Sequence, residues 1–231
     1  MSKFISIIFS LIFASQAMAN IVITGTRVIY PSNEDEVTVK LNNNGKGPVL
    51  IQSWIDDGDV NANPDSIRVP FVITPPINRV DAQKGQALRI SFTKETNLPS
   101  DRESIYWLNV LEIPPKGAAN EGKNKLQVAF RTRIKLFFRP STLEGNSEDA
   151  AEKLKWETNG KDLVVINNSP YYVTLLGVHG SKANLNDIDK MVPPFGRLDL
   201  NVKSGKFNKG DAITYSYMND WGAPKEVKAK I

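Results

Sequence analysis

Apolar and polar residues alternate in short runs along most of this chain, and groups of turn-forming residues separate the runs. Turn groups such as Asn42-Asn-Asn-Gly45 and Asn167-Asn-Ser-Pro170 lie between neighbouring runs. Short alternating runs bounded in this way are typical of strands in a β-sandwich. We therefore predict an all-β fold, with strands at residues 21–23, 27–30, 36–41, 49–55, 71–74, 87–92, 105–113, 126–138, 161–167, 171–178, 197–202 and 212–218.

The strand pattern is interrupted once, near Arg139 and Pro140, where residues 143–152 become polar. A second series of strand-like runs follows this interruption. Only residues 148–156 suggest a short helix or a linker turn. A chain of this length fits two domains of roughly 100 residues each. We predict a first domain at residues 20–141 and a second domain at residues 142–231.

The segment 126–140 is the most informative of these runs. Alternate side chains of a strand point to opposite faces, so Leu126, Val128 and Phe130 share one apolar face, which we call the ridge. A basic and aromatic run from Lys135 to Pro140 follows it. A protein can bury such a ridge in its own core, or it can offer the ridge to a partner that lacks a strand. The pattern alone leaves both uses open.

The N-terminal segment indicates export. Lys3 precedes an apolar stretch at residues 4–14, and Ala17-Met-Ala19 has the small residues that signal peptidase requires. We predict a signal peptide at residues 1–19, whose apolar run is too short to span a bilayer. The chain has no cysteine, so burial of apolar surface has to stabilise the exported fold without disulfides.

Composition and charge argue against several classes of function. The formal charge of +4 becomes +3 when Lys3 is removed, which is too mild for a typical nucleic-acid-binding protein. His179 is the only histidine, and with no cysteine the common nucleophilic and metal sites are missing. We predict no enzyme, no metal and no cofactor, and we interpret His179 as a turn residue. A pair of glycosidase carboxylates leaves no spacing signal, although nothing in the chain calls for one.

The stretch from Leu98 to Pro115, which reads LPSDRESIYWLNVLEIPP, closely resembles the hallmark segment of the periplasmic pilus (fimbrial) chaperone family. The similarity continues through most of the remaining chain. It includes Thr26-Arg27-Val-Ile-Tyr30, Thr74-Pro75-Pro76, Ile134-Lys135-Leu-Phe-Phe-Arg-Pro140, Asn168-Ser-Pro170-Tyr-Tyr172 and Asn219-Asp220-Trp-Gly222.

The resemblance implies two immunoglobulin-like β-sandwiches set at an angle, with a cleft between them. Members of the family work in the periplasm without ATP. They lend a strand to pilus or fimbrial subunits, whose own sandwich is incomplete, and deliver them to an outer-membrane usher. Neither a metal nor a cofactor takes part, and the protein does not insert into a membrane.

The resemblance also assigns roles to individual residues. It makes Leu126, Val128 and Phe130 the donor ridge, where the alternative from pattern alone is a core strand of the first domain. Residues 116–125, rich in Gly, Asn and Lys, resemble the connecting loop of the short-loop branch of the family.

Three further assignments concern charged residues. Arg27 and Lys135 match the two cations that hold the terminal carboxylate of a subunit; the alternative is that both are ordinary surface cations. Arg89, Glu103 and Asp220 match an interdomain charge network, which we expect to orient the domains more than to stabilise them.

The competing interpretation is a secreted immunoglobulin-like adhesin or fibre subunit, which would also be β-rich, exported and free of catalytic motifs. Such a subunit needs an N-terminal extension of alternating residues to donate, whereas this chain enters a strand soon after the predicted signal peptide. The sequence leaves open whether the free protein hides its ridge by self-association.

Overall fold

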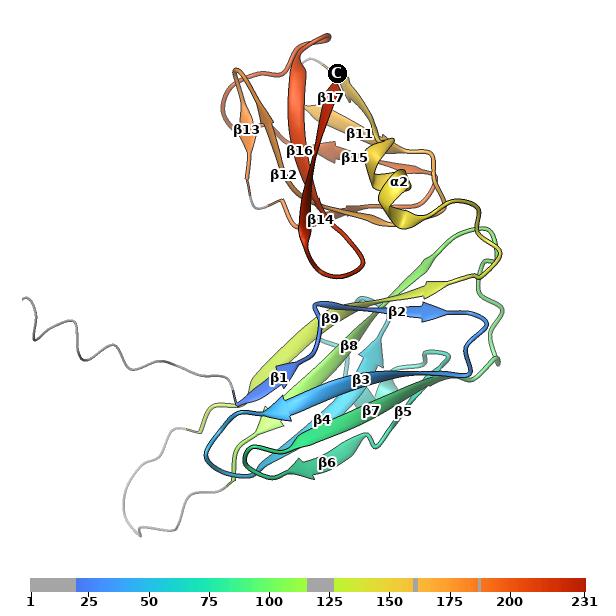
Figure 1. Ribbon diagram of the computed structural model, residues 1–231, viewed down its shortest axis with the longest axis vertical. Helices are drawn as coiled ribbons and strands as arrows, with labels where there is room; N and C mark the ends of the chain where they lie inside the picture. Colours follow the sequence, from blue (N-terminus) through green and yellow to red (C-terminus); the bar gives the residue numbers. More distant parts are fainter. Residues whose placement is uncertain (1–19, 116–126, 160–161, 187) are drawn as a thin grey trace, which may run out of the picture.

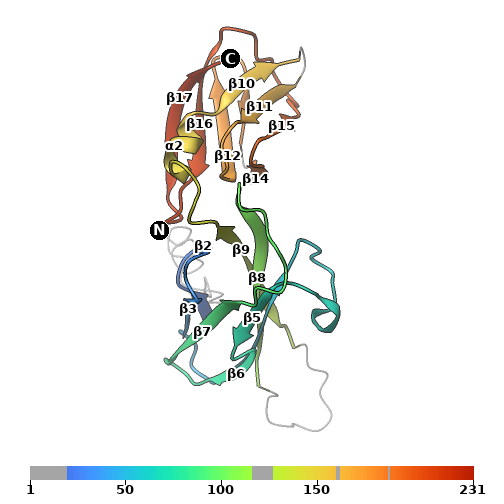
Figure 2. The same ribbon diagram turned by 90° about the vertical axis from the view of Figure 1, so that its right-hand side faces the viewer.

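The computed structural model describes residues 20–115, 127–159, 162–186 and 188–231, and these form two β-sandwiches (Figure 1). The predicted signal peptide lies outside the described residues. Figure 2 shows the two sandwiches one above the other, with β8 (Ser104–Ile113) and β9 (Phe130–Arg139) reaching from the first towards the second. The prediction of an all-β protein with two immunoglobulin-like domains is confirmed.

The first domain contains strands β1 to β9. One sheet has the order β1-β3-β7-β5 and the other the order β2-β9-β8-β4-β6. The N-terminal segment therefore joins both sheets, since β1 pairs antiparallel with β3 and β2 pairs parallel with β9. The remaining elements are β1 (Ile21–Ile23), β2 (Arg27–Pro31), β3 (Glu36–Asn43), β4 (Val49–Asp56), the 3-10 helix η2 (Pro64–Ser66), β5 (Phe71–Thr74), β6 (Ile77–Val80) and β7 (Gly85–Phe92).

Alternation builds the core of the first domain as the sequence predicts. Along β3, Val39 and Leu41 are buried, while Thr38, Lys40 and Asn42 on the opposite face are exposed. A cluster of aromatic rings packs in the core of this domain, and Tyr30 is fully buried within it, against Phe71 and Phe138. The Tyr30 hydroxyl accepts a hydrogen bond from the Phe92 amide and lies 2.9 Å from the Asp35 carbonyl, so the polar group is satisfied.

The second domain has sheets with the orders β10-β11-β15 and β13-β12-β16-β17, and β14 also pairs with β12. A short helix, α2, precedes the first of its strands; its Asn146 cap accepts a hydrogen bond from the Asp149 amide. Tyr215 packs on Trp156 in the core. The elements are α2 (Ser147–Glu152), β10 (Lys155–Thr158), β11 (Leu163–Asn167), β12 (Val173–Gly180), β13 (Asn184–Leu185), β14 (Lys190–Val192), β15 (Gly196–Leu200), β16 (Ala212–Met218) and β17 (Pro224–Lys230).

The structure adds strands that the apolar pattern did not predict. The most informative is β17, where lysines alternate with the half-buried Val227 and Ala229 at the edge of its sheet. Charged edge strands of this kind resist unwanted pairing, and they carry little apolar signal. The predicted boundary between residues 141 and 142 lies in the segment that joins β9 to α2.

No helix in the described part of the chain is long and apolar enough to cross a membrane.

A candidate binding cleft between the domains

Parallel pairing of β2 with β9 brings Arg27 and Lys135 side by side. Arg27 is opposite Lys135 in the register, and residues paired in this way project from the same face of a sheet. Both line a cleft of about 360 Å³ to which the second domain contributes Thr174, Asp189 and Met218. The two cations that were predicted to act together are therefore neighbours at the junction of the domains.

Arg27 is a partly buried cation with no ion pair among the described residues. Its Nη1 donates a hydrogen bond to the Met218 carbonyl at 3.2 Å, and its guanidinium lies 5.8 Å from the centre of the Phe137 ring. Its Nε is buried and finds no hydrogen-bond partner in the described part of the chain. Burial lowers the pKa of Arg27, against the opposing effect of the carboxylates of Asp220, Asp189 and Glu103. The Arg27 guanidinium therefore has N–H donors left for an anion that enters the cleft.

Lys135 is held across the cleft by a carboxylate of the second domain. Its Nζ lies 3.0 Å from Oδ1 of Asp189. The Lys135 side chain is 19% exposed, whereas that of Asp189 is 78% exposed. The ammonium is thus fixed in the cleft wall, and the carboxylate reaches it from the solvent side.

The strand that carries Lys135 has an open edge. On one side β8 pairs with β9 from Phe130 to Phe138. On the other side β2 covers only Lys135 to Arg139, and no described strand pairs with residues 130–134. Unpaired backbone groups at a strand edge invite pairing with another chain. The open edge ends where Arg27 and Lys135 begin.

The predicted ridge lies at the free end of this edge. Val128 is 49% exposed and Phe130 58% exposed, so neither is part of the protein's own core. On the same face of β9, Leu136 and Phe138 are buried in the first domain. The ridge thus continues the inward face of β9 beyond the core that the protein fills by itself. The strand begins at Phe130, later than predicted, and Leu126 lies outside the described residues.

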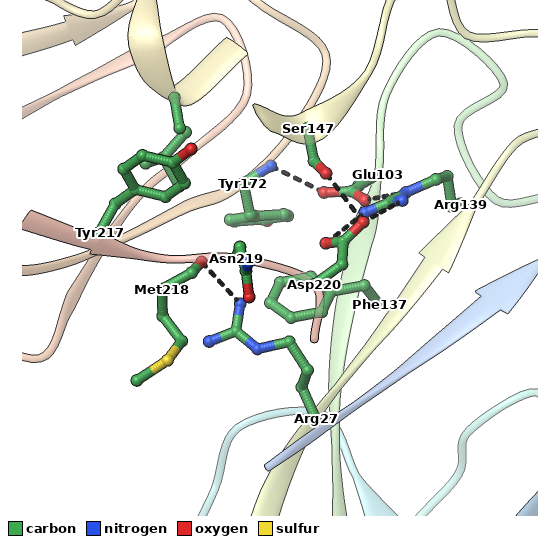
Figure 3. Close-up of a pocket in the computed structure, with 12 residues that line it drawn as sticks. Arg27, Glu103, Phe137, Arg139, Ser147, Tyr172, Tyr217, Met218, Asn219 and Asp220 are labelled. Carbon is green, nitrogen blue, oxygen red and sulfur yellow. Dashed lines mark hydrogen bonds and ion pairs between the residues drawn. The ribbon is translucent and has the colours of Figure 1, made fainter. Parts of the chain in front are cut away.

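A charge network connects the domains behind Arg27 (Figure 3). Arg139, at the end of β9, contacts Glu103 through Nε at 2.6 Å and holds both oxygens of Asp220 at 2.7 and 3.0 Å. Glu103 also accepts a hydrogen bond from the Tyr172 amide, and Asp220 accepts one from the Ser147 hydroxyl. Two carboxylates from different domains therefore share one guanidinium.

The structure corrects one member of the predicted network. Arg89 was named as its cation, but it is exposed on β7 between the buried Leu88 and Ile90, opposite Thr38 and Thr74. Its alternation with buried neighbours turns it away from the sandwich interior. Arg139 takes the place assigned to Arg89. The sequence did contain a signal for this, because Arg139 alternates with Lys135 and therefore shares its face of β9.

Electrostatics favours the charged forms of Asp220 and Arg139 in this network. Burial opposes the charge of Asp220, but the hydrogen bonds and the charge of Arg139 outweigh it and lower the pKa of this carboxyl. Burial likewise opposes the charge of Arg139, and the two carboxylates outweigh it and raise the pKa of the guanidinium. For Glu103 burial is the larger effect and raises the pKa, with Arg139 acting against it.

Arg139→Ala should lower the free energy of unfolding by about 2–3 kcal/mol. The cost of breaking a fully buried pair is about 3–5 kcal/mol, and solvent reaches Arg139 and Asp220 in part. Arg89→Ala is the matched control and should change it by less than about 0.5 kcal/mol. Urea unfolding of the wild type and both variants measures these changes in the free energy of unfolding. Equal effects of the two substitutions would show that the network does not stabilise the fold.

A second buried charge supports the wall of the cleft. Asp56 accepts hydrogen bonds from Arg133, Asn109 and the Gly58 amide. Arg133, which lines the cleft, lies 4.5 Å from the centre of the Trp107 ring. The acidic turn that begins at Asp56 thus fixes an arginine on the same face of β9 as Lys135.

The remaining chemistry-bearing residues are not gathered into a site. His179 is exposed within β12, opposite Asn184 and Thr214, and not in a turn as predicted. Within the described ranges no group of three or more His, Cys, Asp or Glu residues is arranged to hold a metal ion.

Comparison with known proteins gives consistent matches over both domains. The model for the N-terminal domain of the pili and flagellar-assembly chaperone PapD matches residues 20–144, and the model for the C-terminal domain of pili assembly chaperone PapD matches residues 149–229. The probable fimbrial chaperone YadV of Escherichia coli K12 is 46% identical over 229 residues, covering 95% of this chain and 93% of YadV.

Two solved structures are similar over almost the whole chain. The crystal structure of the YadV chaperone has a TM-score of 0.78 at 42% identity and covers 92% of this chain and all of that one. The SafB chaperone, in the structure of Salmonella enterica SafA pilin in complex with SafB, has a TM-score of 0.79 at 28% identity, covering 94% of this chain and 99% of that one.

Proposed function

This chain belongs to the family of periplasmic pilus-assembly chaperones, and from that premise we propose that it binds fimbrial subunits along the open edge of β9 and holds their terminal carboxylate at Arg27 and Lys135. It acts in the periplasm, without ATP and without catalysing a reaction. The subunits that it folds and caps pass from it to an outer-membrane usher.

The observation that carries the proposal is the continuity of the open edge with the two cations. No strand within the described ranges pairs with residues 130–134 of β9 on one side, and Arg27 and Lys135 lie where that gap ends. A guanidinium and an ammonium together can hold both oxygens of a carboxylate. A chain that ends at these cations can lie along residues 130–134 in the space that β2 leaves free.

This arrangement also gives the direction of the bound strand. β9 runs from Phe130 towards Arg139, and β2 is parallel to it from Lys135 onwards. A subunit strand whose C-terminus is held at Lys135 must therefore run parallel to β9, and it ends where β2 starts. The fixed end sets the register, because a slip of one residue would turn every side chain of the strand to the opposite face.

The exposed ridge supplies the hydrophobic part of the interaction. Full burial of an apolar side chain of this size contributes about 1.5–3 kcal/mol. Val128 and Phe130 start about half exposed, so each contributes less than the full amount. Ordering the strand and immobilising two molecules reduces the net gain further. Backbone pairing along residues 130–134 adds specificity for an unfinished sheet.

The competing function, a fibre subunit or adhesin, finds less support. The family assignment covers both domains, and the relative SafB is described in complex with a pilin. Self-association of the free protein through the ridge is compatible with the proposal, since a second copy would cover the same apolar side chains.

Hydrogen exchange tests the use of the open edge. When a fimbrial subunit is exported together with the chaperone and the complex is purified, backbone amides of residues 130–134 should exchange more slowly than in the free protein. Amides of β16, paired on both sides within the second domain, serve as the internal control. Unchanged exchange at residues 130–134 in a purified complex would place the subunit elsewhere.

A further inference from the structure

We propose that Asp189 is an internal occupant of the carboxylate site and makes the site selective for a chain end presented on a strand. The inference rests on the proposed role of Arg27 and Lys135. In the free protein the carboxylate of Asp189 pairs with Lys135, and a bound chain end has to displace it.

The ion pair between Asp189 and Lys135 has the geometry expected if Asp189 occupies the place of a bound carboxylate. Asp189 belongs to the second domain and pairs across the cleft with Lys135 of the first, at 3.0 Å from Oδ1 to Nζ. Both side chains line the same cleft. Asp189 is mostly exposed, so it can leave Lys135 and return to water at little cost, whereas Lys135 is fixed by the strand beneath it.

Asp189 fills only half of the site. Arg27 has no ion pair in the described part of the chain, and its Nε is buried without a partner. The hydroxyl of Thr174, also in the cleft wall, is buried and has no hydrogen-bond partner among the described residues. A carboxylate that contacts Arg27 and Lys135 together therefore gains donors that Asp189 does not use. Buried donors without partners are unfavourable, which gives an entering carboxylate a further advantage.

Selectivity follows from the competition between the two carboxylates. Asp189 is tethered close to Lys135, so its effective concentration is high and a free carboxylate in solution competes poorly with it. A carboxylate at the end of a strand also gains backbone pairing along residues 130–134, and this additional binding lets it displace Asp189. The pair thus disfavours small anions and permits chain ends that are aligned with β9.

The test compares two forms of one fluorescein-labelled peptide of alternating valine and threonine residues, with either a free C-terminal carboxylate or an amide. Binding to the wild type and to Asp189→Asn is measured by fluorescence anisotropy. We expect Asp189→Asn to tighten binding of the free acid about two- to fivefold, the range for an exposed ion pair, and to leave the amide unchanged. Asp199→Asn, which removes an exposed carboxylate paired with Arg197, is the matched control.

Asparagine is a suitable replacement because Asp189 has a positive φ of 35°, a region that asparagine tolerates better than most residues. Thermal unfolding checks the fold of the variant, and Asp189→Ser serves as a second substitution.

Each outcome has a separate meaning. If the wild type prefers the acid over the amide and Asp189→Asn leaves this ratio unchanged, the placeholder role is rejected while the carboxylate site stands. If neither protein distinguishes acid from amide, the site at Arg27 and Lys135 fails, and the role of Asp189 fails with it. A preference that appears only in Asp189→Asn supports the inference.

Discussion

Chaperone carrying Arg27→Ala or Lys135→Ala should no longer yield a complex when a fimbrial subunit is exported with it. Each substitution removes one of the two cations that we propose hold the terminal carboxylate, in a cleft that is only partly open to solvent. Truncating one partner of such a charge pair costs about 2–5 kcal/mol, or roughly 30-fold to several thousand-fold in affinity. The amount of subunit recovered with the chaperone from the periplasm measures the loss.

The loss should come from binding and not from unfolding. Among the residues that the structure describes, Arg27 donates a single hydrogen bond, to the Met218 carbonyl, and Lys135 pairs only with the exposed Asp189. The variants should therefore remain folded. Arg197→Ala is the control, because it removes an arginine that is paired with Asp199 on the surface of the second domain. Normal recovery of subunit with Arg27→Ala and Lys135→Ala would contradict the carboxylate site.

Val128→Asp should weaken subunit binding roughly a thousandfold. In the proposed donor strand, the substitution puts an unpaired carboxylate against the apolar groove of the subunit, which costs several kcal/mol relative to valine. Val128 is 49% exposed and precedes the strand, so the free chaperone should keep its stability. Competition with labelled wild-type chaperone for the subunit measures the affinity, and urea unfolding checks the fold.

Val72→Asp is the matched control for this experiment. Val72 is 52% exposed on β5, in the other sheet of the first domain. Its substitution by Asp introduces the same charge away from β9. The donor-strand role would be rejected if Val128→Asp and Val72→Asp bound the subunit equally well. Phe130→Asp gives a second test of the ridge at the first residue of β9.

The sequence predicted features that depend on neighbours along the chain. Alternation in the run from residue 126 placed Val128 and Phe130 on one face and Lys135 on the other. In the structure Phe130 and Lys135 likewise lie on opposite faces of β9. Turn residues and the polar interval after Pro140 indicated two β domains. Alternation failed for β17, because a lysine-rich edge strand with only half-buried Val227 and Ala229 has little apolar contrast.

Contacts between distant segments were decided by the tertiary structure alone. Parallel strand pairing puts Arg27 beside Lys135, and domain packing brings Asp189 to Lys135. Packing also puts Arg139, and not Arg89, between Glu103 and Asp220. All of these contacts join residues that lie far apart in the chain. A sequence specifies which face of a strand a side chain occupies, because that depends on local geometry. It does not specify which of many charged residues meet, because that depends on how two sheets and two domains pack.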